Sequence, residues 1–185
     1  MTEIKKKNAN GSARLVIVLF LIAAITALCL GLVDYITRDR IAGIKADKTA
    51  AAMSEVMPGS YTFQEVETET ADPVVGIYAA NSGANTYGFV AEVVIAGSQG
   101  DIDMLVGVDL NGSVTGVAIV DMSETAGLGD NASKAEWRAQ FVGASGELAV
   151  SKDGGTIDAL TGATVTSRAV TNGVNAAIAA VQTLG

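Results

Sequence analysis

Ten residues near the C-terminal end of the chain combine the properties of a phosphate-binding loop. Residues 158–167 read Asp-Ala-Leu-Thr-Gly-Ala-Thr-Val-Thr-Ser and lead into a helical pattern. Glycine lets a ligand approach the backbone closely, and the free N–H groups and positive dipole end of a helix start attract anions. The structural alternative is that Thr166 or Ser167 caps the helix and the other residues only connect it to the chain. The residue types alone leave both interpretations open.

A second segment, residues 122–130, could bring backbone close to a ligand. It reads Met-Ser-Glu-Thr-Ala-Gly-Leu-Gly-Asp, follows a predicted strand and precedes a helical pattern. Gly127 and Gly129 stand two residues apart, which indicates a loop that passes close to another group. An ordinary turn between a strand and a helix would also explain this pattern, because Gly-Leu-Gly alone is weak evidence.

The residue types that are missing exclude several kinds of chemistry. The 185 residues include no histidine and one cysteine. A Ser-His-Asp triad, a histidine-ligated haem and a His/Cys zinc site therefore cannot be built, and a hydrolase is disfavoured. An iron–sulfur cluster needs about four cysteine ligands, so the chain cannot hold one alone. Any redox chemistry must use an organic cofactor or a metal bound only by oxygen ligands.

Charge is distributed unevenly along the chain. Residues 1–33 carry four basic residues and one acidic residue, whereas residues 34–185 carry eight basic and 19 acidic residues. The net charges of the two parts are +3 and −11. Such an acidic domain repels phosphate backbones, so we expect no nucleic-acid partner. It also avoids anionic lipid headgroups, which fits a domain that stands off a membrane.

The elements that must position these loops follow from periodicity. Alternating apolar residues predict four strands, and Asn111-Gly112 predicts a hairpin turn between the last two. Helical spacing predicts one helix after each of the two loops. The predicted strands are 74–79, 87–95, 104–110 and 114–120, with a short strand at 147–151, and the predicted helices of the domain are 132–141 and 166–184. These elements predict one α+β domain, an antiparallel sheet with helices, over residues 59–185.

An apolar segment near the N-terminus predicts a membrane anchor. Residues 15–33 are 19 residues without a charge, and as a helix they reach about 29 Å, close to the thickness of a hydrocarbon core. Lysines and an arginine within residues 1–14 predict a cytoplasmic N-terminus and a domain on the outer side of the cell membrane. Residues 34–58 predict a juxtamembrane helix, ended by Pro58-Gly59. A cleaved signal peptide is the alternative, although no small-x-small site follows the segment closely.

The single cysteine, Cys29, lies in the outer half of this segment. Leu28 occupies the position where a lipid-attachment site would have a small residue. We expect Cys29 to be a small apolar packing residue; a ligand of a cluster shared between subunits is the alternative.

The two loops together resemble those of the FMN-binding domain family. The chain has Glu-Thr-Ala-Gly-Leu-Gly at 124–129 and Asp-Ala-Leu-Thr-Gly-Ala-Thr at 158–164, behind one N-terminal apolar segment. Within the family it is similar to the G subunits of Rnf ferredoxin:NAD oxidoreductases and to the related C subunits of sodium-pumping NADH:quinone oxidoreductases. The resemblance extends over essentially the whole chain. It departs at Ala126, where the family usually has proline.

This resemblance implies a covalently bound FMN. In the family, Asp-x-x-Thr-Gly-Ala-Thr is the acceptor sequence of a flavin transferase, which joins FMN through its phosphate to the last threonine. That residue is Thr164 in this chain. The resemblance assigns cofactor-binding roles to further residues of both loops: Asp158, Thr161, Gly162, Ala163, Thr166, Glu124, Thr125, Gly127, Leu128 and Gly129.

The function implied by the resemblance is that of a membrane-anchored electron-transfer subunit. It would work with the other membrane and peripheral subunits of an Rnf-type complex, which couples electron transfer between ferredoxin and NAD to Na⁺ or H⁺ transport. We expect no substrate turnover by the chain alone. Two alternatives stay open: a C-type subunit of the quinone reductase, for which 185 residues is short, and a non-redox membrane-anchored binding or assembly module of the same fold.

Overall fold

The computed structural model describes residues 3–184, which form two compact units. The first unit is Met1–Ala46 and the second is Asp47–Gly185. Helix α1, Glu3–Val56, begins in the first unit and ends in the second.

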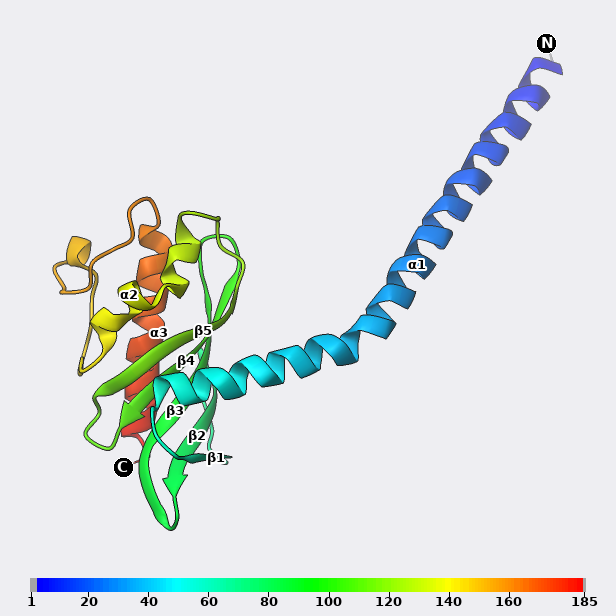
Figure 1. Cartoon of the computed structure of the whole chain (residues 1–185). Helices are drawn as coiled ribbons and strands as arrows, with labels where there is room; N and C mark the ends of the chain where they lie inside the picture. Colours follow the sequence, from blue (N-terminus) through cyan, green and yellow to red (C-terminus); the bar gives the residue numbers. More distant parts are fainter. Residues whose placement is uncertain (1–2, 185) are drawn as a thin grey trace. The chain divides into compact units, whose positions relative to one another are not determined.

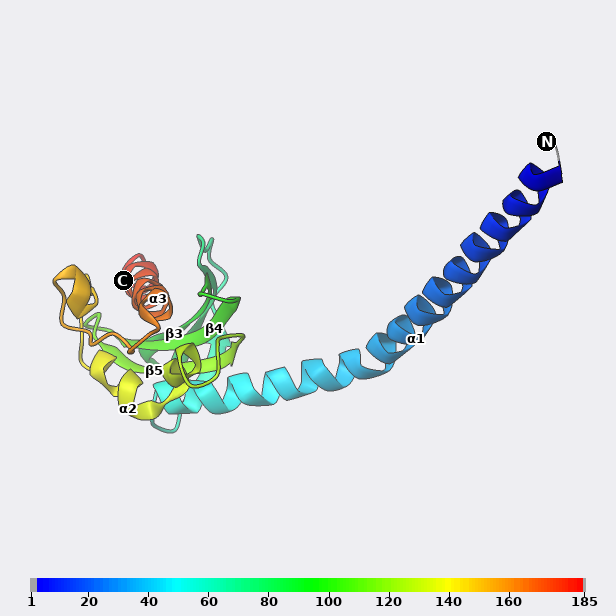
Figure 2. The same cartoon turned by 90° about the horizontal axis from the view of Figure 1, so that it is seen from above.

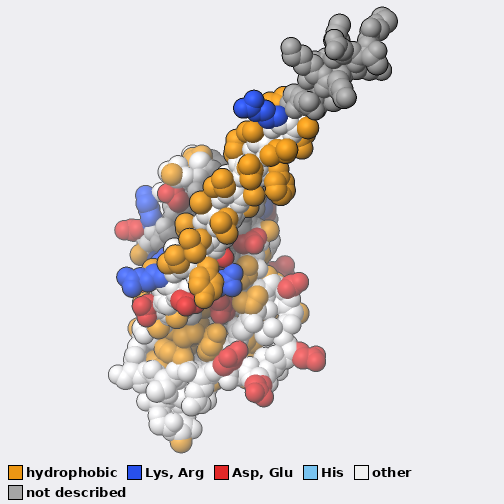
Figure 3. Space-filling view, turned by 90° about the vertical axis from the view of Figure 1, so that its right-hand side faces the viewer, with side chains coloured by type: hydrophobic (Ala, Val, Ile, Leu, Met, Phe, Trp, Pro, Cys, Tyr) orange, Lys and Arg blue, Asp and Glu red, His pale blue; other side chains and the backbone are white. Residues whose placement is uncertain are grey.

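The first unit consists of helix with exposed apolar side chains. Helix α1 contains one segment, within Ala13–Val56, that is long and apolar enough to cross a membrane. The large apolar side chains between Leu15 and Val33 are 45% to 73% exposed, and Figure 3 shows them as a continuous apolar surface along the helix. Exposure of so much apolar area to water would be unfavourable, so this helix anchors the protein in a membrane.

The second unit is built on a five-stranded antiparallel sheet in the order β1-β2-β3-β4-β5 (Figure 1). Every strand pairs with its neighbour in sequence, so the sheet is a meander. The strands are β1 Thr62–Glu65, β2 Val74–Ser82, β3 Asn85–Ala96, β4 Asp101–Asp109 and β5 Val114–Met122. The predicted α+β class is confirmed, and each of the four predicted strands lies at its expected place. The short edge strand β1 was not predicted.

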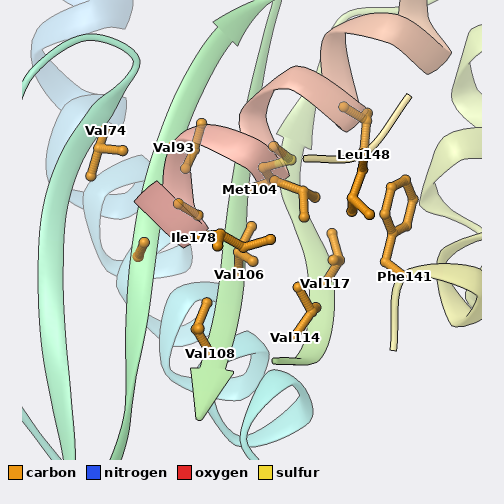
Figure 4. Close-up of a cluster of buried hydrophobic side chains, with 14 of the residues drawn as sticks. Val74, Val93, Met104, Val106, Val108, Val114, Val117, Phe141, Leu148 and Ile178 are labelled. Atoms are coloured by element: carbon orange, nitrogen blue, oxygen red, sulfur yellow. The ribbon is translucent and has the colours of Figure 1, made fainter. Parts of the chain in front are cut away.

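Helix α3, Thr164–Gln182, covers one face of the sheet (Figure 2). Its buried side chains, among them Val170, Val174 and Ile178, pack against strand residues such as Val93 and Met104. Figure 4 shows how Phe141 and Leu148, from the connection after β5, extend this core. The apolar stripe of α3 therefore fixes the position of its N-terminal end, where the first candidate loop lies.

The last turns of α1 cover the opposite face. Ala52, Met53, Val56 and Met57 pack on buried residues of β2 to β5. Gly107 and Gly116 are paired directly across β4 and β5, and a Cβ added at Gly116 would lie 2.7 Å from the Cα of Val56. Because neither position has a side chain, the backbone of α1 can lie directly against β4 and β5.

Hydrogen bonds hold the end of α1 in this position on the sheet. The hydroxyl of Thr115 donates to the carbonyl of Val56 at 2.6 Å. The Arg138 guanidinium donates to Glu55 at 2.9 Å and also to the carbonyl of Val117. The end of α1 is thus part of the folded domain.

The connection between β5 and α3 differs most from prediction. The expected helix at 132–141 is three short pieces: η1 Gly129–Ser133, α2 Ala135–Arg138 and η2 Ala139–Phe141. The expected strand at 147–151 is wrong. Val150 makes one isolated bridge to Ile157, and the chain then enters η3, Ser151–Asp153. The physical reason is that the Asn175 side chain bonds both the N–H and the carbonyl of Leu148, at 2.8 Å each.

Candidate functional site

Thr164 is the first residue of α3, and no side chain of the described residues caps this helix end. The capping alternative is wrong, because both proposed caps bond elsewhere. Thr166 donates to Glu124 at 3.0 Å. Ser167 donates to the carbonyl of Ala163 and accepts from the N–H of Leu160, both at 2.9 Å. The helix therefore starts two residues earlier than expected, and the N–H groups of its first turn remain available to an anion.

One basic side chain contacts the Thr164 hydroxyl, and a second belongs to a residue one helical turn further along α3. The ammonium group of Lys152, in η3, donates to Thr164 Oγ1 at 2.7 Å. The neighbouring Asp153 accepts two hydrogen bonds from Arg168, one helical turn after Thr164, at 2.7 Å each. These bonds hold the pKa of the Asp153 carboxyl below its usual value and raise the pKa of the Arg168 guanidinium. The pair fastens η3 to the first turns of α3.

The loop before Thr164 is held by its backbone. Trp137 Nε1 donates to the carbonyl of Asp158 at 2.7 Å, and the N–H of Asp158 donates to Gln140 Oε1 at 2.7 Å. Gly162 has a φ of +77°, a conformation that side-chain-bearing residues rarely adopt. The Thr161 side chain is exposed and that of Ala163 is buried. This geometry turns the chain sharply, so that Thr164 follows directly at the helix start.

Glu124 joins three segments through its carboxylate. One oxygen accepts from the N–H groups of Ser98 and Gln99, at 2.6 and 3.3 Å, and the other accepts from Thr166. Both oxygens are therefore bonded within the protein. Glu124 acts by tying the turn between β3 and β4, its own loop and α3 together.

The two glycines of the second loop have different surroundings. A Cβ added at Gly129 would lie 2.9 Å from both the Cβ of Glu124 and Oγ1 of Thr166, so this position requires glycine for close packing. Gly127 has a φ of +76°, and an added Cβ would meet nothing within 4 Å. Gly127 is thus required by its backbone conformation, and open space lies before it.

The structure brings the two predicted loops into contact. A Cβ at Gly162 would lie 3.0 Å from Cδ2 of Leu128, and Thr166 bonds Glu124. Leu128 is 42% exposed and Val165, next to Thr164, is 55% exposed. The loops thus offer apolar side chains, open glycine backbone and an anion site together. These are the properties needed to hold a flat, aromatic, phosphate-bearing group such as FMN.

Two candidate residues make hydrogen bonds within their own loop or to an adjoining segment. Thr125 accepts backbone bonds from Leu128 and Asp130 within its own loop, and Asp158 bonds only the segment at 137–140. Sequence reasoning missed Lys152, Asp153 and Arg168. The one signal for Lys152 and Arg168 was that basic residues are rare in this part of the chain.

Other features of the described residues do not compete with this site. No group of three or more Asp, Glu or Cys residues within the described range could hold a metal ion. Two surface pockets, of about 320 and 440 Å³, lie along the C-terminal half of α3. They share Ala176 and Ala179 and border none of the residues of the two loops. At the N-terminal end of α3, the Thr164 hydroxyl, the Lys152 ammonium and the open glycine backbone of the loops occur together.

The fold and the site define an FMN-binding domain on a membrane anchor. The model of the FMN-binding domain family matches residues 97–179, which contain both loops. The chain is 32% identical over 191 residues to the G subunit of the Na⁺-translocating ferredoxin:NAD⁺ oxidoreductase complex of Acetobacterium woodii, covering 92% of each chain. It is 31% identical over 172 residues to the G subunit of an ion-translocating oxidoreductase complex of Methanosarcina acetivorans, covering 89% of this chain and 92% of the relative.

The chain belongs to this family of G subunits of ion-translocating oxidoreductase complexes. Among solved structures, it is similar to the C subunit of the Na⁺-translocating NADH-quinone reductase of Parabacteroides distasonis. That match has 23% identity and a TM-score of 0.46, and it covers 56% of this chain and 60% of the other.

Proposed function

We propose that the protein carries FMN in a phosphoester bond to Thr164 and passes electrons within an Rnf-type complex. One observation carries the proposal: the Thr164 hydroxyl lies at the uncapped first turn of a 19-residue helix, in contact with a cation. A phosphate ester there receives backbone N–H bonds and the helix dipole. FMN, when bound, supplies electron transfer, which this chain's own side chains cannot provide.

Formation of the ester follows a balanced exchange of bonds. The Oγ–H bond of Thr164 breaks and an Oγ–P bond forms. With a flavin dinucleotide as donor, the bond from the FMN phosphorus to the bridging oxygen breaks, and a nucleoside monophosphate leaves. The hydroxyl proton passes to a base of the flavin transferase. The covalent bond would retain the cofactor in a domain on the outer side of the membrane, where a dissociable flavin would be lost.

The remaining loop residues orient the ring and the linkage. Leu128 and Val165 offer exposed apolar surface on either side of the acceptor loop, and the open space before Gly127 gives room for a planar group. Glu124 and Thr166 fix the distance between the loops, because they bond each other at 3.0 Å. Asp158, Thr161, Gly162 and Ala163 present the acceptor to the transferase.

The partners are the other membrane and peripheral subunits of the complex. The relatives are named as G subunits of ion-translocating oxidoreductase complexes, which supports the same assembly for this chain. The basic N-terminal residues support a cytoplasmic N-terminus and an FMN domain on the outer face of the membrane.

The test is the replacement Thr164→Ala in the full-length protein, produced together with the flavin transferase. We expect complete loss of covalent flavin, measured as in-gel fluorescence after denaturation and as intact mass, with an unchanged circular-dichroism spectrum. Thr156→Ala is the matched control, since Thr156 is an exposed threonine outside both loops. A fluorescent, mass-shifted Thr164→Ala protein would refute the assignment.

A further inference from the structure

Basic residues are rare in the folded domain, and two of them lie at Thr164. Residues 49–185 contain four basic and 16 acidic residues. One of the four, Arg138, has an 11% exposed side chain and pairs with a glutamate of α1. Lys152 contacts the Thr164 hydroxyl, and Arg168 lies one helical turn after Thr164 in α3. In so acidic a domain, this placement indicates a point where negative charge must be neutralised.

The Lys152 side chain is placed to neutralise negative charge at Thr164. Its ammonium donates to Thr164 Oγ1 at 2.7 Å. A lysine ammonium has three donors, so two remain for the oxygens of a phosphoryl group on that hydroxyl. Charge-assisted bonds of this kind are about twice as strong as neutral ones.

The segment that carries Lys152 is held in place on both sides. At its base, Val150 bridges Ile157, both nearly fully buried, and the N–H of Ser151 donates to the carbonyl of Ile157 at 2.7 Å. At its tip, Asp153 makes the two 2.7 Å bonds to Arg168. Arg168 therefore pairs with Asp153, and Lys152 is the cation that contacts the Thr164 hydroxyl.

We propose that Lys152 is the positioning residue for FMN attachment and the counter-ion of the resulting phosphodiester. During attachment, its ammonium stabilises the charge that develops on Thr164 Oγ1 and on the phosphoryl oxygens. Afterwards, it pairs with the anionic oxygen of the diester and limits the rotation of the linkage. This inference rests on the proposed function, because it requires FMN on Thr164.

The experiment compares Lys152→Gln, Lys152→Arg and Lys134→Gln in full-length protein incubated with the transferase and its flavin donor. Lys134 is an exposed lysine of the same domain outside the site. Loss of one charge-assisted hydrogen bond should slow FMN attachment about tenfold in Lys152→Gln, as followed by intact mass. Lys152→Arg should restore most of the rate, and Lys134→Gln should equal the wild type.

A second measurement reads the linkage itself. The phosphorus resonance of the attached diester should shift in Lys152→Gln and stay unchanged in Lys134→Gln, which a purely structural role of Lys152 would not produce. Wild-type protein without covalent flavin would refute the proposed function. Flavinylated wild type, with an equal attachment rate and an unchanged resonance in Lys152→Gln, would refute the role of Lys152 alone.

Discussion

Gly127 and Gly129 stand two residues apart in one loop but are required for different physical reasons. Gly127 has a left-handed backbone with open space before it, whereas Gly129 packs against Glu124 and Thr166. From the sequence, both were expected to leave room for the flavin ring. The space at Gly129 is filled by the protein's own side chains, so only Gly127 has room beside it for a ligand.

The pair Gly127→Ala and Gly129→Ala tests this difference. Gly127→Ala should cost about 1 kcal/mol through its positive φ and should alter the flavin absorbance if the ring occupies the open space. Gly129→Ala should displace Glu124 and lower stability by about 1 to 3 kcal/mol. Urea unfolding and the visible spectrum, recorded on the same samples, separate the two effects. A Gly127→Ala protein with an unaltered flavin spectrum would remove Gly127 from the ring site.

A carboxylate at the hairpin tip predicts a pH dependence of stability. Asp109 accepts backbone bonds from Ser113 at 2.9 Å and Asn111 at 2.8 Å. The bond from Ser113, with that from Asn111, lowers the pKa of Asp109 below its usual 3.8. A lowered pKa stabilises the fold above about pH 3.8, and the contribution is lost as the pH falls through the folded-state value. The difference in urea midpoint between wild type and Asp109→Ala should thus be full at pH 7 and should shrink below pH 3.8; a constant difference would contradict it.

At the scale of elements, the sequence predicts what repeats and misses what is irregular. Strands β2 to β5 are nine to twelve residues long and rich in apolar residues, so the apolar pattern of the sequence locates them. Strand β1 has four residues, too few for a period to be recognised. The connection from β5 to α3 is held by side-chain bonds to backbone, such as that of Asn175 to Leu148. Such long-range partners leave no local pattern.

The same limit applies to the site. The acceptor loop and the glycine loop were recognised because each is a contiguous motif. Lys152 was not recognised, because it reaches Thr164 across 12 residues through a fold that periodicity does not describe. The start of α3 was placed two residues late because Thr166 resembles a cap in sequence, whereas its hydroxyl bonds Glu124, 42 residues away.

The close packing of α1 on the glycines of β4 and β5 gives a prediction about the contact between the helix and the sheet. Gly116→Ala places a Cβ 2.7 Å from the Cα of Val56 and should push the helix out, at a cost of about 1 to 3 kcal/mol. Gly76→Ala is the matched control, because its added Cβ would have an ordinary contact at 3.6 Å and no positive φ is involved. Thermal unfolding of both variants is the measurement. Equal melting temperatures of the two variants would show that α1 can move away from the added Cβ without loss of stability.

At the scale of the whole molecule, the distribution of charge predicts the orientation in the membrane. The +3 segment should remain in the cytoplasm and the −11 remainder should be translocated. Protease added to intact spheroplasts should therefore digest the domain that begins at Asp47. Protection in spheroplasts, with digestion only in inverted vesicles, would reverse the orientation and contradict the proposed site of electron transfer.

The packing of the end of α1 on the sheet also sets an order of events during synthesis. Val56 bonds Thr115, 59 residues further along the chain. At about 5 to 20 residues per second, the ribosome needs about 3 to 12 s to supply that partner. Throughout this interval Ala52, Met53, Val56 and Met57 are made but have no sheet to cover. The residues at the end of α1 are thus among the first of the domain to be synthesised, and they stay unburied until the strands that cover them have been made.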